Sequence, residues 1–516
     1  MTGTRPPMHW RCRKAIFLFC ALCIFGLLSI SMVSLSISSI ANPSNNYMAL
    51  SNSELAVDRS IAASDSIISD ISSGNGGRRL DSNQDSLLQD DRLFYMYELE
   101  EKYWWAWPEP NSDCSRNKYV KAVYANLSGI GPPIAPEDGL FMTWHFSIFS
   151  ALYNRYKRSK RRTLDPEKAS IFIIPYDLAL DGYTDRVTCL NRNPLRCTPG
   201  NVWDLQQMLK FNKYFHRHKG ADHVVLWSLH QYHAYPRTCD GFMMRFCEHC
   251  TITCYWMDYT IKDNRFVSIP FPSAYHFWDG IKNLPWDTKL APQRSHLAVY
   301  VGSTLTITPY HTKIRKTMTG QCDKKRNCHW LKIFHSSTDT RFVEFITIYK
   351  KAVFCLCPPG DDPGRKAVFD SIVSGCIPVI FHESTIYNQY PWHITEEIAL
   401  DISVFIPGAQ LINGSLDMMS ILSSIGADVI KKKQEAIALL APKLQYAIPP
   451  LETLENRSDI TKWDPPFKDA AEMALDGMFL RVRNVLKNES TNIPRVFLNA
   501  TEWEQRYSTV MIQVPK

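Results

Sequence analysis

Two adjacent cations, Arg365 and Lys366, follow Gly360 in the run PPGDDPGRK and come just before an apolar helical pattern. The first turn of a helix already carries partial positive charge, so each cation there is expected to cost about 0.3–1 kcal/mol at an exposed site. A bound anion would reverse this cost, because free backbone N–H groups, a closely approaching glycine and two cations suit a diphosphate. The alternative is that Asp361 and Asp362 neutralise both cations on a solvated face.

A strand, a helix and a second strand position these cations. Residues 352–357 form a short apolar run ended by two prolines, which predicts an interior strand. Asp362 is predicted to be the N-cap, Pro363 the first helical residue and Gly375 the helix end. Residues 377–381 are predicted to form the second strand. Such a βαβ unit implies a parallel sheet covered by helices. The G-x-G-x-x-G and G-x-x-x-x-G-K-[ST] motifs are absent, which argues against a dehydrogenase or a P-loop ATPase.

The composition predicts a globular protein with two ordinary domains. The chain has 516 residues, of which 45% are hydrophobic and 21% are charged. Its net charge of +7 is mild, and the basic run at 157–162 is expected to be a solvated helix end rather than a nucleic-acid-binding arm.

The N-terminal residues predict a membrane anchor. Residues 1–14 form a basic tail, and the apolar run at 15–40 is long enough to cross a bilayer. A cleaved signal peptide is the alternative, but the run exceeds the usual signal core. The positive-inside rule then places everything after residue 40 in the lumen, where residues 41–91 are predicted to be a disordered stem. Five N-x-[ST] sequons on that side agree with this topology and predict glycosylation of Asn126, Asn413, Asn456, Asn488 and Asn499.

The cysteines also favour an oxidising compartment. The chain has 15 cysteines, and 12 of them follow residue 100. Cys189 with Cys197 and Cys322 with Cys328 are local candidates for disulfides. The motif CEHCTITC at 247–254 is compatible with a zinc site, but in a lumenal protein we favour disulfides there.

The body of the chain predicts two α/β domains, at 92–285 and 286–485, followed by a C-terminal extension at 486–516. The second domain is expected to end with an amphipathic helix at 469–485. Polar groups at predicted strand ends are the candidates for ligand contacts, because such sheets bind ligands there. In the first domain they are His145, Asp177, Asp181, His230 and His233.

Several blocks resemble the exostosin family of glycosyltransferases, glycosyltransferase family 47, over about residues 92–485. They occur in the order LFYMYEL, RTLDPEKASIFIIPY, GADHVVLWS, VSIPFP, VYVG and FCLCPPGDDPGRKAVFDSIVSGCIPVIF. The run from Phe381 to His393 is most similar to the plant-type xyloglucan galactosyltransferase branch. Departures from that branch occur at 362–364, at Lys366 and at 383–384.

This resemblance implies a Golgi type II membrane enzyme of the GT-B fold, with two Rossmann-like domains facing across a cleft. It would use a UDP-sugar and invert the anomeric centre. Carried over by position, the residues expected to line the nucleotide side are Gly302, Arg315, Gly360, Arg365 and Asp370. Arg365 would reach the diphosphate, which agrees with the argument from the helix start.

Inverting transfer needs a base for the acceptor hydroxyl and positive charge for the departing UDP. Asp177, Asp181 and His145 are the candidate bases, and Glu383 is placed to contact the sugar or ribose unless it is an ordinary loop carboxylate. The sequence has no D-x-D motif, so we expect the cations to replace a metal and no cofactor to be required.

Alternatives remain at this point. The donor sugar is expected to be galactose, with UDP-glucuronate or UDP-xylose as rival donors. A carbohydrate-binding protein without turnover would keep the fold but would not need Arg365. A receptor-like protein would be expected to show repeats, and none is found. The expected partners are a glycan or polysaccharide acceptor and Golgi glycosyltransferases, with no nucleic acid.

Overall fold

The structure is a computed structural model of the chain. It describes residues 92–99, 129–177, 201–231, 247–258, 261, 263–286, 294–324, 326–332, 342–456 and 460–488. The chain divides into two compact units, Met1–Gln89 and Asp90–Lys516, and every described residue belongs to the second unit. The predicted anchor at 15–40 and stem at 41–91 lie outside the described residues. Within the described residues, no helix has the length and apolar character needed to span a membrane.

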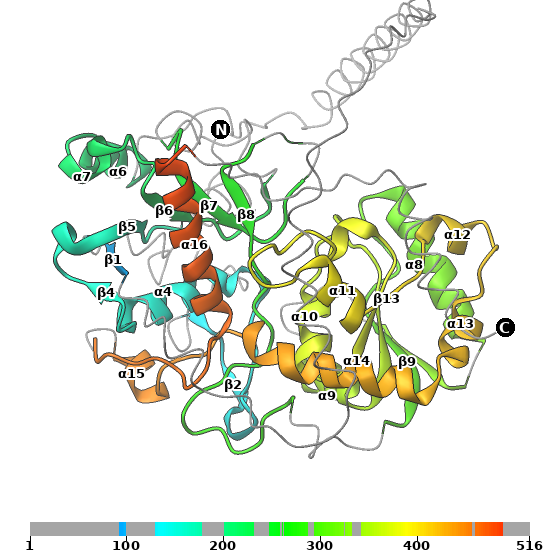
Figure 1. The fold of residues 1–516 in the computed structure, drawn as a ribbon. Coiled ribbons are helices and arrows are strands. Elements are labelled where there is room, and N and C mark those ends of the chain that lie inside the picture. Colours follow the sequence, from blue (N-terminus) through cyan, green and yellow to red (C-terminus); the bar gives the residue numbers. More distant parts are fainter. Residues whose placement is uncertain are drawn as a thin grey trace, which may run out of the picture. The chain divides into compact units, whose positions relative to one another are not determined.

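A sheet of six parallel strands forms the first half of this unit (Figure 1). Its strands, in spatial order, are β4 (Arg162–Thr163), β1 (Leu93–Met96), β5 (Ala169–Ile174), β6 (His223–Leu226), β7 (Thr251–Cys254) and β8 (Phe266–Ser268). A separate antiparallel pair consists of β2 (Pro133–Ala135) and β3 (Leu140–Phe141).

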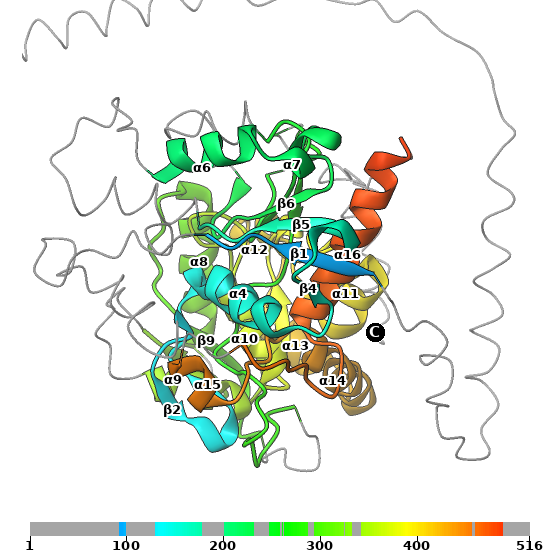
Figure 2. The same ribbon diagram turned by 90° about the vertical axis from the view of Figure 1, so that its left-hand side faces the viewer.

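Helices cover both faces of this first sheet, because alternate residues of its buried strands point to opposite sides. Ile171 and Ile173 of β5 enter one hydrophobic cluster, together with residues of α4 (Ile148–Arg158) and α16 (Ala470–Leu486). Phe172 and Ile174 enter another, together with residues of α6 (Asn201–Lys210) and α7 (Lys213–Arg217). Figure 2 shows α6 and α7 on one side of β5 and β6 and α4 on the other.

A second sheet of five parallel strands forms the other half. Its strands, in spatial order, are β10 (Cys328–Leu331), β9 (His296–Val301), β11 (Ala352–Cys357), β12 (Ile377–Ile380) and β13 (Val404–Phe405). Its helices are α8 (Pro309–Cys322), α9 (Phe342–Lys350), α10 (Lys366–Val373), α11 (Glu396–Ile402), α12 (Gly408–Ile412), α13 (Met418–Ser424) and α14 (Ala427–Leu440), and the short α15 (Leu451–Glu455) follows. The predicted α/β class with parallel sheets and the βαβ unit β11–α10–β12 are confirmed.

The last helix, α16, returns to the first sheet. It packs against β5, β7 and α4. Its N-cap Asp469 is fully buried, and its carboxylate accepts a hydrogen bond from Arg155 of α4 at 3.2 Å. The predicted helix at 469–485 therefore exists, but it covers the first sheet rather than the second sheet, to which the sequence-based division at residue 286 assigned it.

The two halves are joined by hydrogen bonds from buried polar side chains. The Gln389 side chain accepts from the Met257 backbone N–H at 3.1 Å and donates to the Met257 carbonyl at 3.0 Å. The Tyr446 hydroxyl donates to the carbonyl of Pro270 at 2.6 Å. A buried polar group is costly unless it is paired, so these contacts fix where the halves meet.

The disulfide pattern differs in part from the prediction. Cys322–Cys328 is confirmed, and Cys355–Cys376 is an additional bond that links β11 to the residue before β12. The three cysteines of CEHCTITC are buried and form no disulfide among the described residues, so the favoured disulfides are not found there. Among the described residues, no three His, Cys, Asp or Glu side chains are grouped to hold a metal. The predicted Cys189–Cys197 pair lies outside the described residues.

Candidate anion site at the ends of the second sheet

The loop from Pro358 to Arg365 joins the carboxyl end of β11 to α10 and brings two arginines together. Gly360 is buried between them: a Cβ atom built on it would lie 2.2 Å from Nη1 of Arg365 and 3.5 Å from Nη2 of Arg315. A side chain at this position would therefore push the Arg365 guanidinium aside. Glycine leaves room here for that group to lie against the loop backbone.

Arg315 enters the site from α8 and is held by backbone carbonyls. Its Nε donates to Pro359 O and its Nη1 to Ser303 O, both at 2.8 Å. The residue is only 4% exposed, and burial, aided by the nearby Arg365 charge, lowers the pKa of its guanidinium to about 10. It stays protonated at neutral pH. Its buried Nη2 has no hydrogen-bond partner among the described residues.

Arg365 stands at the N-cap position of α10 and is half-buried. Its Nε is buried and also lacks a partner within the described ranges. The carboxylate of Asp361 accepts from the Ile307 N–H, and that of Asp362 accepts from the Gly364 N–H. No ion pair between described residues joins Arg315 or Arg365 to a carboxylate. The local acids thus do not neutralise these arginines.

The start of α10 is a correction to the sequence analysis. The helix begins at Lys366, not at Pro363, and Asp362 caps a turn that precedes it. A side-chain oxygen of Asp that bonds the N–H two residues ahead competes with helix formation. Gly364, which follows Pro363, also has low helix propensity. It packs closely on Trp256, since a Cβ atom built on Gly364 would lie 3.0 Å from the Trp256 side chain.

Lys366 and Asp370 pair with one another. The Lys366 ammonium contacts both carboxylate oxygens of Asp370 at 2.8 Å, one turn along α10. Asp370 also accepts from the Ala274 backbone N–H at 2.8 Å, which ties α10 to the first half. Both residues were predicted to bind nucleotide, but in this structure their charges are mutually satisfied.

Gly302 and Glu383 lie near the same sheet edge. Gly302 follows β9, and its carbonyl accepts from Trp330 Nε1 at 3.0 Å. Next to it, the Ser303 carbonyl is one of the two that hold Arg315. Glu383 follows β12 in the short 3-10 helix Glu383–Thr385, with a side chain 38% exposed and 3.9 Å from His382 Nδ1. Glu383 thus follows a strand at the same end of the second sheet as Gly302, and its side chain is partly exposed.

Two of the predicted bases lie in the described part of the first half. Asp177 follows β5 and accepts from the Ser228 hydroxyl at 2.6 Å, which brings together residues that follow β5 and β6. His145 precedes α4, is half-buried, and has its ring 4.8 Å from that of Trp144. Asp181 and His233 lie outside the described residues.

His230 is a further site residue, to which the sequence analysis assigned no role beyond its position at a strand end. Its Nε2 lies 3.5 Å from Oδ2 of Asp362, so it connects the first half to the loop that carries Arg365. Burial lowers the pKa of His230, which favours the neutral imidazole. The strand-end position after β6 was the available signal, but the contact itself depends on how the two halves meet.

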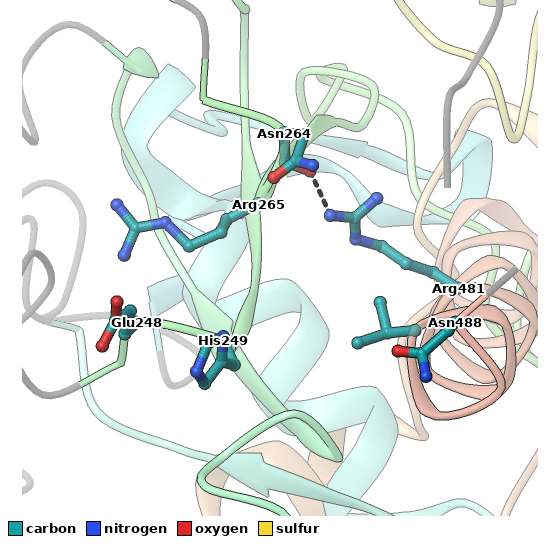
Figure 3. A pocket seen from close by; sticks show the side chains of 7 residues that line it. Glu248, His249, Asn264, Arg265, Arg481 and Asn488 are labelled. Atoms are coloured by element: carbon teal, nitrogen blue, oxygen red, sulfur yellow. Dashed lines mark hydrogen bonds between the residues drawn. The ribbon is translucent and has the colours of Figure 1, made fainter. Parts of the chain in front are cut away.

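A separate pocket of about 290 Å³ lies where β7 and β8 begin, at the opposite ends of strands from Asp177 and His230 (Figure 3). Across it, Arg481 of α16 donates to the Asn264 carbonyl. Its lining residues are Glu248, His249, Asn264, Arg265, Arg481, Val485 and Asn488.

Three predicted sequon asparagines, Asn413, Asn456 and Asn488, are described and exposed. Their glycosylation stays a prediction. Asn126 and Asn499 lie outside the described residues.

Two guanidiniums, one buried and one half-buried, thus lie at the carboxyl ends of the second parallel sheet of this α/β protein without a carboxylate partner among the described residues, and this arrangement suits an anion. The model of the exostosin GT47 domain matches residues 89–424, which is more than half of the chain. The chain therefore belongs to the exostosin GT47 family, as its sequence blocks predicted.

The relatives carry the names of xyloglucan glycosyltransferases of Arabidopsis thaliana. Probable xyloglucan galactosyltransferase GT12 is 24% identical over 88% of this chain and 90% of its own length. Probable xyloglucan galactosyltransferase GT13 is 26% identical over 69% of this chain and 79% of its own length. Xyloglucan-specific galacturonosyltransferase 1 is 23% identical over 67% of this chain and 50% of its own. Among solved structures, the S. aureus MnaA–UDP co-structure covers 69% of this chain and 96% of that chain at 10% identity, and its TM-score of 0.30 is too low to support an argument.

Proposed function

We propose that this chain is a hexosyltransferase that moves galactose from a UDP-sugar to a polysaccharide or glycan acceptor, with inversion of the anomeric centre. The proposal takes the two halves to be the two Rossmann-like domains of a GT-B enzyme. Family membership and the names of the relatives support a glycosyltransferase. The observation that carries the donor side is the pair Arg315 and Arg365, whose buried Nη2 and Nε have no partner among the described residues.

The donor side of the proposed mechanism follows from charge. A diphosphate placed between Gly360 and the first turn of α10 would meet both guanidiniums and the free N–H groups of the helix start. These charges stabilise UDP as the bond between the anomeric carbon and the phosphate oxygen breaks. Because the sequence has no D-x-D motif, the proposal assigns this task to the arginines and requires no metal cofactor.

The acceptor side of the proposal lies in the first half. A base takes the proton of the acceptor hydroxyl while its oxygen bonds to the anomeric carbon from the face opposite UDP. Asp177 is a candidate because it lies at a strand end and already accepts a hydroxyl hydrogen bond, from Ser228. His145 and Asp181 are the other candidates.

The proposed location is the Golgi membrane, with residues 15–40 as a type II anchor and the catalytic region in the lumen. The basic tail, the apolar run and the sequons of the sequence support it. Protease protection of a C-terminal tag in sealed membranes is the expected result. Digestion of that tag without detergent would refute the topology.

The deciding experiment is removal of Arg365. Arg365→Ala is expected to weaken UDP binding, measured by calorimetry, and to lower turnover on the real acceptor about 100-fold or more, because one preorganised donor contributes about 2.7–4 kcal/mol. Lys313→Ala is the matched control, since Lys313 is an exposed cation on the same helix as Arg315 and should change neither quantity. An Arg365→Ala protein with wild-type UDP affinity and turnover would reject the donor site.

A uronic acid donor is the second candidate function. One relative is named a galacturonosyltransferase and is about as similar in sequence as the galactosyltransferases. A panel of UDP-sugars that includes the galactose, xylose, glucuronate and galacturonate forms, assayed with and without EDTA, separates the donors. Strict loss of activity in EDTA would reject the metal-free mechanism.

A further inference from the structure

His230 is fixed in one orientation by rings at the carboxyl ends of the first sheet. Its ring centroid lies 5.9 Å from that of Tyr255, 6.3 Å from that of Trp256 and 5.9 Å from that of Phe271. These three residues come after β7 and β8. Its side chain is 13% exposed, and its Nε2 faces the second half. Such a ring cannot move away without disturbing its aromatic neighbours.

Asp362 is the centre of the loop that His230 faces. Its Oδ1 accepts from the Gly364 N–H at 2.9 Å, and its carbonyl accepts from the Gly360 N–H at 2.7 Å. Asp362 thus fixes the position of Gly360, which makes room for the two guanidiniums. It also fixes the turn that leads into Arg365. Its remaining oxygen, Oδ2, is the one that lies 3.5 Å from His230 Nε2.

This distance is too long for a formed hydrogen bond, and a small approach of the loop would close it. Contacts in ligand-free sites are often long and tighten when the substrate binds. The loop also rests on Trp256 through Gly364, so it already touches the first half beside His230.

We propose that His230 is a positioning residue for the donor: through Asp362 it holds the Gly360–Arg365 loop against the first half when the nucleotide sugar is bound. This inference rests on the proposed function and deepens it. The His230–Asp362 contact would then join the half that binds the acceptor to the loop that binds the diphosphate.

Three variants test the link. His230→Ala removes the ring nitrogen, His230→Gln keeps a side-chain amide near it, and Asp362→Asn replaces the anionic Oδ2 while keeping an oxygen for Gly364. We expect His230→Ala to raise KM for the UDP-sugar and to lower kcat, each about tenfold, and His230→Gln to recover part of both. The double variant His230→Ala/Asp362→Asn should be no worse than the more severe single variant, because both remove one interaction.

The control is His249→Ala, an exposed histidine in the pocket of Figure 3, which should leave kcat and KM unchanged. Thermal unfolding of each variant separates folding from positioning. Multiplicative effects in the double variant, or a lowered Tm with wild-type kcat and KM, would overturn the role of His230. These outcomes are distinct from failure of the proposed function, which would show as unchanged UDP binding in Arg365→Ala.

Discussion

Arg315 on α8 and Arg365 at the start of α10 are two like charges that lie close together around Gly360. Their mutual repulsion and the loss of hydration both disfavour the folded, ligand-free state, and the lowered pKa of Arg315 is the local sign of this cost. Such an arrangement is expected in a site where a bound anion offsets this free-energy cost. The two carbonyls that fix Arg315 meanwhile keep its third nitrogen, Nη2, pointed at Gly360.

The geometry of Arg315 predicts that a positive charge alone at this position is not sufficient for UDP binding. Arg315→Lys keeps a cation but cannot bond Pro359 O and Ser303 O while also offering a nitrogen to a ligand. We expect UDP affinity to fall about tenfold or more, and the free energy of unfolding to fall by about 1–3 kcal/mol because a buried carbonyl loses its donor. Calorimetry with UDP and urea unfolding measure the two effects. Wild-type affinity in Arg315→Lys would contradict the bidentate role.

The contrast between Arg365 and Lys366 shows what residue-level reading can and cannot predict. The basic pair before an apolar helix was sufficient to predict an anion site, which stays a prediction, and the family blocks added Arg315. The sequence alone did not separate the two cations. The structure separates them: Lys366 and Asp370, four residues apart in α10, form an ion pair, whereas Arg365 has no carboxylate partner among the described residues.

At the scale of elements, the βαβ unit that carries the site is closed by the Cys355–Cys376 disulfide. Cys355 lies in β11 and Cys376 just before β12, so the bond spans the crossover that contains α10. This bond limits the freedom of the unfolded chain over a separation of 21 residues. The loop that holds Gly360 and Arg365 lies inside the closed segment.

Removal of this bond should therefore destabilise the protein more than removal of the shorter one. Cys355→Ala/Cys376→Ala is expected to lower the free energy of unfolding by about 3 kcal/mol. Cys322→Ala/Cys328→Ala, with a separation of 6 residues, should lower it by about 2 kcal/mol. Denaturant unfolding measures both variants in the same buffer. Equal midpoints for wild type and Cys355→Ala/Cys376→Ala would contradict the expectation.

Most elements followed from periodicity and capping residues. The amphipathic helix expected at 469–485 is α16, and Asp469 caps it. The errors arose where a side chain redirects the backbone. The segment 201–217 forms two helices, α6 and α7, rather than one, because the Asn212 side chain accepts from the N–H groups that begin α7. The same competition moved the start of α10.

At the scale of the molecule, buried histidines make stability depend on pH. Burial lowers the pKa of His276 and of His393 to about 4, while each returns to about 6.5 in the unfolded chain. Between these values the unfolded chain binds protons that the folded protein does not, so stability is full above about pH 6.5 and is lost as the pH falls toward 4. Each histidine should account for about 3 kcal/mol over that range.

Unfolding free energies measured from pH 7 to pH 4 test this slope. His393→Gln keeps a donor for the Ala470 carbonyl, to which His393 Nε2 donates at 2.9 Å, but it cannot titrate. This variant should show a flatter dependence than wild type between pH 6.5 and 4. Parallel curves for the two proteins would contradict the role of His393.

The packing between the halves was beyond sequence reasoning. The hydrogen bonds from Gln389 to Met257 and from Ala274 to Asp370, and the approach of His230 to Asp362, join residues about 100 positions or more apart. No local pattern marks such partners, because their geometry depends on how two sheets dock rather than on propensity. The residues proposed for the donor side could therefore be predicted from the sequence, whereas the contacts that join the two halves could not.

The return of α16 to the first sheet has a consequence for engineering. A chimera made by exchanging everything before residue 286 between two relatives would join one protein's sheet to another protein's covering helix. The Arg155–Asp469 contact and the apolar face beneath α16 would then be mismatched. Exchange of the first half between family members should thus transfer the C-terminal segment 460–488 together with it, as one cassette cut at two places.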